Sequence, residues 1–146
     1  MGAYHFFTFC RPAADQAANF IATVPAEPGT LPPAIDLEFG GNCSARPGRA
    51  ELLAEVAVFG KALQAHYGVP PVIYATYPFV ETYLQDALPE YPLWIRDIYK
   101  APEVAHGRPW TVWQFSSRGR IPGIDTFVDE NAFAHTPADF QALLTR

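Results

Sequence analysis

Short apolar runs recur along the chain, separated by loops rich in proline and glycine, and helical patterns follow some of them. Runs of this kind, rich in β-branched and aromatic residues, are typical of buried strands. Their alternation with helical segments is typical of an α/β chain with a largely parallel sheet. The pattern predicts six strands, over residues 3–9, 34–39, 71–75, 93–97, 111–115 and 126–128.

The clearest helical pattern lies between the second and third predicted strands. Pro47 suits the first turn of this helix and Gly68 suits its end. Apolar residues at spacings of four, three, four and four form one stripe along it: Leu52, Val56, Phe59, Leu63 and Tyr67. Further helices are predicted over residues 13–23, 79–84 and 137–144.

Two carboxylates stand where the second predicted strand ends. The apolar residues 31–35 are followed directly by Asp36, Leu37 and Glu38. Residues i and i+2 of a strand point the same way, so Asp36 and Glu38 share one face. Crowding raises at least one pKa of such a pair, so that one group stays protonated while the other is charged. Glycoside hydrolysis uses such a pair, but both residues could equally be solvated side chains that open a loop.

Length and composition narrow the class of protein. A chain of 146 residues fits one domain, residues 1–146, with a proper core. Aromatic residues make up 14% of the chain, a density that suits sugar binding but also an ordinary core. The net charge of -5 and the scattered basic residues argue against a nucleic-acid partner. No apolar stretch approaches the roughly 20 residues that span a bilayer, so no membrane partner is expected, and no signal peptide is recognised at the start.

Two cysteines fall after neighbouring predicted strands. In a barrel of parallel strands, catalytic groups collect at the carboxyl ends of the strands, where Asp36 and Glu38 also lie. Cys10 follows the first strand and Cys43 the second, so both belong to neighbouring loops on the same rim. Such loops can reach the Cα separation of roughly 4.4 to 6.8 Å that a disulfide requires. Either two buried thiols or one disulfide is compatible with the sequence.

The four histidines indicate neither a catalyst nor a metal site. His5 is expected to be a hydrogen-bonded residue of the barrel, because an acid pair leaves it no obvious proton to carry. His66, His106 and His135 fit no common metal-ligand spacing. We therefore expect no metal and no cofactor.

Six segments together resemble the glycoside hydrolase family 25 lysozymes, the muramidases that cut bacterial peptidoglycan. They occur in the family's order and span nearly the whole chain. The segments are Gly2-Ala3-Tyr4-His5-Phe6, Pro33-Ala34-Ile35-Asp36-Leu37-Glu38, Val72-Ile73-Tyr74, Pro92-Leu93-Trp94-Ile95, Trp113-Gln114-Phe115-Ser116-Ser117 and Val128-Asp129-Glu130-Asn131.

The resemblance implies a modified (β/α) barrel of the TIM-like type, with acids of several strands in its active site. Glu38 matches the general acid that protonates the glycosidic oxygen. Asp36 would be its charged neighbour, which stabilises positive charge at the sugar ring or orients the 2-acetamido group, and Asp129 matches a further acid. Attack by a carboxylate and participation of the substrate's acetamido group are both open. The residues expected to bind substrate, each ring having the core as its alternative, are Tyr4, Tyr74, Trp94, Trp113 and Asn131.

The sequence departs from the family at its start. Members open with a strand that carries an Asp-Val-Ser type motif and with a second strand, whereas this chain begins at the Gly-Ala-Tyr-His-Phe segment. We expect an incomplete barrel of about six of the eight strands, without the first-strand Asp. Exposed strand edges would then be covered by a second copy, a domain swap or rearranged packing, or would lower solubility. A misplaced start codon or a truncated sequence best explains the two missing strands. We expect the full-length form to be secreted or periplasmic.

These features predict an enzyme that hydrolyses the β-1,4 bond between N-acetylmuramic acid and N-acetylglucosamine, with peptidoglycan glycan strands as its partner. The alternative is a fragment that binds peptidoglycan without cutting it, or a degenerate fragment with no function of its own. A chitinase is disfavoured. Its strand motif, Asp-x-x-Asp-x-Asp-x-Glu, carries acids that residues 32–35 lack.

Overall fold

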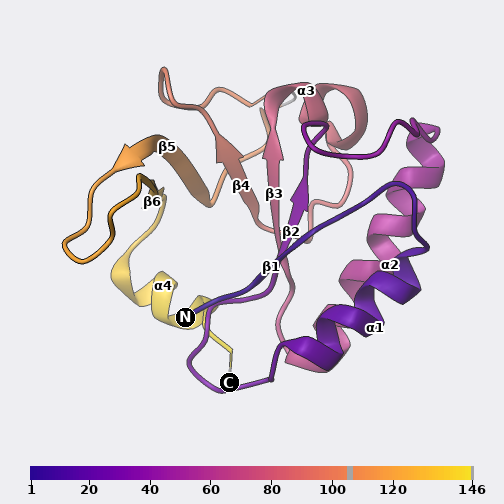
Figure 1. Cartoon of the computed structure of the whole chain (residues 1–146), viewed down its shortest axis with the longest axis horizontal. Coiled ribbons are helices and arrows are strands. Elements are labelled where there is room, and N and C mark those ends of the chain that lie inside the picture. The colour runs from indigo at the N-terminus through magenta and orange to yellow at the C-terminus, as the bar shows by residue number, and fades with distance from the viewer. Residues whose placement is uncertain (105–106, 146) are drawn as a thin grey trace.

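The protein is built on one six-stranded sheet that curls into a half barrel (Figure 1). The computed structural model describes residues 1–104 and 107–145. The strands follow one another across the sheet in chain order, the first five parallel and the last antiparallel to its neighbour. They are β1 (Tyr4–Phe6), β2 (Ala34–Leu37), β3 (Val72–Thr76), β4 (Leu93–Arg96), β5 (Val112–Gly119) and β6 (Val128–Phe133).

The helices cover the outer face and one end of the half barrel. Two long helices, α1 (Ala13–Thr23) and α2 (Arg49–Tyr67), pack against each other beside the sheet (Figure 1). A short α3 (Tyr77–Phe79) runs into the π-helical turn η1 (Val80–Leu84). The last helix, α4 (Pro137–Leu143), lies below β6, and none of the helices in the described ranges is long and apolar enough to cross a membrane.

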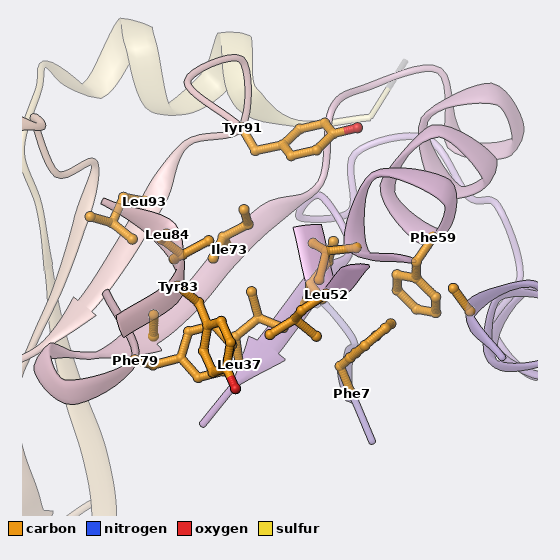
Figure 2. Packing of buried hydrophobic residues seen from close by; sticks show 14 of the residues in the cluster. Phe7, Leu37, Leu52, Phe59, Ile73, Phe79, Tyr83, Leu84, Tyr91 and Leu93 are labelled. Carbon is orange, nitrogen blue, oxygen red and sulfur yellow. The ribbon is translucent and has the colours of Figure 1, made fainter. Parts of the chain in front are cut away.

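The core lies between the outer face of the sheet and the helices. Ile35, Ile73 and Ile95, one from each of three adjacent strands, are fully buried there. Phe59 of α2 is also fully buried and meets the ring of Phe7 edge-on at 5.6 Å (Figure 2). Because side chains alternate along a strand, these residues leave the intervening positions, such as Asp36 and Tyr74, on the concave face.

Most predicted elements are confirmed, including the α/β class, the largely parallel sheet and the buried stripe of α2. Gly68 ends α2 with a φ of 74°, a conformation that favours glycine. The prediction that the first turn of this helix includes Pro47 was wrong, because Gly48 is the N-cap and the helix begins at Arg49. The last strand was predicted too early, at residues 126–128. It runs over Val128–Phe133, where its polar residues pair with β5.

Candidate active site

A cavity of about 240 Å³ opens on the concave face of the half barrel. Every strand contributes a side chain to its wall, and β2 contributes two, Asp36 from the strand and Glu38 from the residue just after it. Asp36, Tyr74 and Trp94 lie side by side because their strands are paired in this register. The full lining is Tyr4, Asp36, Glu38, Tyr74, Trp94, Gln114 and Asp129.

Asp36 and Glu38 enter this cavity together, as their i, i+2 spacing predicts. Asp36 is only 8% exposed, and its Oδ1 atom has no hydrogen-bond partner among the described residues. Burial, and secondarily the charge of Glu38, raises the pKa of Asp36 to about 7. The raised pKa was predicted from crowding, but burial is its larger cause. The group with the raised pKa is Asp36, which was expected to be the charged neighbour of Glu38. Asp36 therefore holds a proton up to about neutral pH.

We expect Asp36→Asn to stabilise the protein at pH 8 more than at pH 5. The folded pKa of about 7 lies above the model value of 3.8, so the stability that Asp36 contributes is present at low pH and lost as pH rises toward 7. A neutral amide avoids this loss. The difference in unfolding free energy between variant and wild type should grow by about 2 kcal/mol between the two pH values, measured by urea denaturation.

The matched control is Asp129→Asn. Asp129 lines the same cavity but is exposed to solvent, so its replacement removes no buried carboxyl group. If Asp36→Asn changed the unfolding free energy equally at pH 5 and pH 8, the Asp36 carboxyl would not be the buried group described above.

The aromatic wall of the cavity is held by hydrogen bonds. Tyr74 meets Trp94 edge-on, with ring centroids 5.1 Å apart, and its hydroxyl donates to Oε1 of Gln114 at 2.8 Å. Burial, followed by the charges of Glu38 and Asp36, raises the pKa of Tyr74, so this hydroxyl keeps its proton. Tyr4, at the edge of the cavity, is 68% exposed. Its ring is therefore open to a ligand.

The structure places two of the predicted substrate-binding residues elsewhere. Trp113 precedes Gln114 on β5 and therefore faces the opposite side of the sheet, where its Nε1 donates to the carbonyl oxygen of Asp97 at 2.7 Å. Trp113 is therefore not part of the lining of this cavity, and its contact with substrate stays a prediction. Asn131 lies outside the cavity lining, and its Oδ1 accepts the Nε1 proton of Trp94 at 2.8 Å. Asn131 therefore positions a ring of the site.

The loops after β1 and β2 are tied together next to Glu38. Cys10 and Cys43 form a disulfide with a Cα–Cα distance of 6.4 Å, so the disulfide alternative holds. The side chain of Asn42 accepts the backbone N–H of Phe9 at 3.1 Å and donates to the carbonyl oxygen of Glu38 at 3.2 Å. This loop pair fixes the backbone that carries Glu38.

His5 has the structural role predicted for it. It lies on the helix-facing side of β1, where its Nε2 is 2.9 Å from Oε1 of Gln16 and its ring packs against Phe59. His106, one of the histidines considered above, lies outside the described residues.

Comparison with known proteins identifies the family of this chain. The family described as Glycosyl hydrolases family 25 matches residues 1–124. The chain belongs to this family. The family 25 resemblance is thus confirmed, and so is the incomplete barrel, because the six-stranded half barrel superposes on solved family 25 structures.

Two solved structures and one curated relative illustrate the extent of the match. A family 25 glycosyl hydrolase from Bacillus anthracis is 35% identical, with a TM-score of 0.88 over 95% of this chain and 66% of that chain. A bacterial lysozyme from Streptomyces coelicolor is 27% identical, with a TM-score of 0.84 over 97% of this chain and 70% of the other. The uncharacterized protein YegX of Escherichia coli O157:H7 is 36% identical over 143 residues, 98% of this chain and 51% of the relative. This family 25 chain thus spans about half the length of the curated relatives it matches.

Two residues of this family 25 site were missed in the sequence. Gln114 was included in a family motif but was not predicted as a site residue. Its polar side chain inside a predicted strand could have indicated that it faces a cavity. Asn42 gave no such signal, because an amide in a loop after two glycines is common and its partners come from a different loop. Both act through contacts between distant segments.

Proposed function

We propose that this chain forms the catalytic part of a muramidase that hydrolyses the β-1,4 bond between N-acetylmuramic acid and N-acetylglucosamine in peptidoglycan. Membership of glycosyl hydrolase family 25 supports this function. The observation that carries it is the acid pair in the concave cavity, of which Asp36 keeps a proton to about pH 7. A cavity that holds two carboxyl groups, of which Asp36 keeps its proton near neutral pH, has the components that glycosidic cleavage requires.

In the proposed reaction, Glu38 gives a proton to the glycosidic oxygen as the bond to the sugar breaks. The sugar then carries positive charge in an oxocarbenium-like state, which a charged Asp36 stabilises. The unliganded protein holds the proton on Asp36, so the proposal requires that the developing positive charge favour the state in which Glu38 holds it. Asp129, across the cavity on β6, adds a further negative charge. Attack by a carboxylate and by the substrate's acetamido group both fit this arrangement.

The aromatic residues of the cavity are proposed to bind the glycan. Tyr4, Tyr74 and Trp94 line the cavity next to the acids, and aromatic rings stack on the apolar faces of sugars. Trp94 is kept in place by Asn131, and Tyr74 by Gln114. We propose that the protein meets its substrate, the cell wall, outside the cytoplasm.

The direct test is release of reducing sugar ends from purified peptidoglycan by the protein. The proposal predicts steady release. A second candidate function, glycan binding without cleavage, is favoured by the openness of the concave face at β1, where Tyr4 is 68% exposed. Binding of peptidoglycan with no release of reducing ends would support that second function and contradict the first.

A further inference from the structure

The side-chain amide of Gln114 makes one hydrogen bond among the described residues. Gln114 is only 3% exposed on β5 and lines the cavity that holds the acid pair. Its Oε1 accepts the hydroxyl proton of Tyr74 at 2.8 Å, and this is the one side-chain hydrogen bond of Gln114 within residues 1–104 and 107–145, so its Nε2 has no protein acceptor there. An amide N–H on a cavity wall that has no protein acceptor is free to donate to an acceptor that a ligand brings.

Tyr74 determines which end of this amide faces the cavity. Its hydroxyl donates to Oε1 of Gln114, and burial and the nearby carboxyl groups raise its pKa, so the proton of this bond is retained. A donor beside Gln114 holds the amide oxygen and leaves the amide nitrogen free. The Tyr74 ring is itself supported edge-on by Trp94.

The same cavity contains a buried carboxyl oxygen, Oδ1 of Asp36, that has no hydrogen-bond partner among the described residues. This oxygen is an acceptor when Asp36 is charged, as the proposed reaction requires. A donor, an acceptor and the rings of Tyr74 and Trp94 in one cavity complement a secondary amide with a methyl group. An acetamido group supplies a carbonyl oxygen for the donor, an N–H for the acceptor and a methyl group for the rings. A sugar hydroxyl has no apolar part to place against the rings.

We propose that Gln114 contacts the substrate by donating from Nε2 to the carbonyl oxygen of an N-acetyl group on the glycan, and that Tyr74 is the positioning residue that orients its amide. The inference rests on the proposed function, because it names the part of the glycan that the same cavity recognises. It makes Gln114 a determinant of specificity for N-acetylated over de-N-acetylated sugars.

The experiment compares two soluble probes, peptide-free peptidoglycan glycan strands and the same strands after chemical de-N-acetylation. Both are titrated by calorimetry into the full chain carrying Glu38→Gln, so that binding is measured without cleavage. Adding Gln114→Met, which keeps the length of the side chain and removes its donor, should weaken binding of the N-acetylated strands about tenfold and leave the de-N-acetylated strands unchanged. The matched control is Gln141→Met, an exposed glutamine of α4 that should alter neither affinity.

Tyr74→Phe is a second variant. Its readout is the preference for N-acetylated over de-N-acetylated strands, which a purely structural role of Tyr74 would not change. The variant should lose this preference, and combining it with Gln114→Met should cause no further loss, because both act on one hydrogen bond. Equal weakening on both probes, or full affinity in Gln114→Met, would overturn the inference while the proposed function stands. Absence of binding of either probe to the Glu38→Gln parent would overturn the proposed function and the inference together.

Discussion

Glu38→Gln is expected to lower turnover on peptidoglycan by about 10²- to 10⁴-fold and to leave glycan affinity nearly unchanged. The amide has the size of the carboxyl group but cannot give a proton to the glycosidic oxygen. Glu38 lies at the end of β2, held by the bond from Asn42 to its carbonyl oxygen, so the substitution leaves the loop in place. Initial rates of reducing-end release measure the turnover, and titration with glycan strands measures the affinity.

The matched control for this variant is Glu51→Gln. Glu51 is an exposed residue in the first turn of α2, outside the acid-pair cavity, and its replacement should leave the rate within about twofold of wild type. If Glu38→Gln retained the wild-type rate, Glu38 would not be the proton donor. Asp36, whose pKa is about 7, would then be the next candidate for that role.

Phe59→Ala is expected to lower the free energy of unfolding by about 3–5 kcal/mol, the usual cost of removing a large buried ring. Phe59 is fully buried and lies between the sheet and α1. Its ring centroid is 5.0 Å from that of His5, 5.6 Å from that of Phe7 and 6.4 Å from that of Phe20. The deletion would therefore open a cavity that these neighbours cannot easily fill. Urea denaturation followed by circular dichroism measures the change.

The control is Val58→Ala on the same helix. Val58 is 47% exposed, so its truncation should change the unfolding free energy by less than about 0.5 kcal/mol. A loss below about 1 kcal/mol for Phe59→Ala would contradict the packing of α1 and α2 around this ring.

The elements with a regular apolar period were predictable from the sequence. The stripe of α2 repeats at helical spacing, and the short apolar strands β2, β3 and β4 are buried on their helix-facing side. β6 was not predictable at its true position, because Asp129, Glu130 and Asn131 read as a polar loop. They form a strand because β5 supplies hydrogen-bond partners for their backbone, and this depends on a neighbour in space.

The candidate site was predictable where it depends on strand geometry. The shared face of Asp36 and Glu38 follows from the alternation of side chains along β2. The same alternation holds on β5. Gln114 points into the cavity, whereas its neighbour Trp113 points to the other side of the sheet. The pKa of Asp36 is set mainly by burial, which depends on packing across the whole sheet and cannot be read from two acids in the sequence.

The most direct test of the proposed function identifies the sugar at the new chain end. Peptidoglycan is digested with the protein, the products are reduced with borohydride, and the reduced terminal sugars are identified by mass spectrometry. A muramidase leaves N-acetylmuramic acid at the new reducing end, so the reduced form of this sugar should appear with wild-type protein and be absent with Glu38→Gln. Reduced N-acetylglucosamine in its place, or no new reduced end, would contradict cleavage of the N-acetylmuramic acid to N-acetylglucosamine bond by this site.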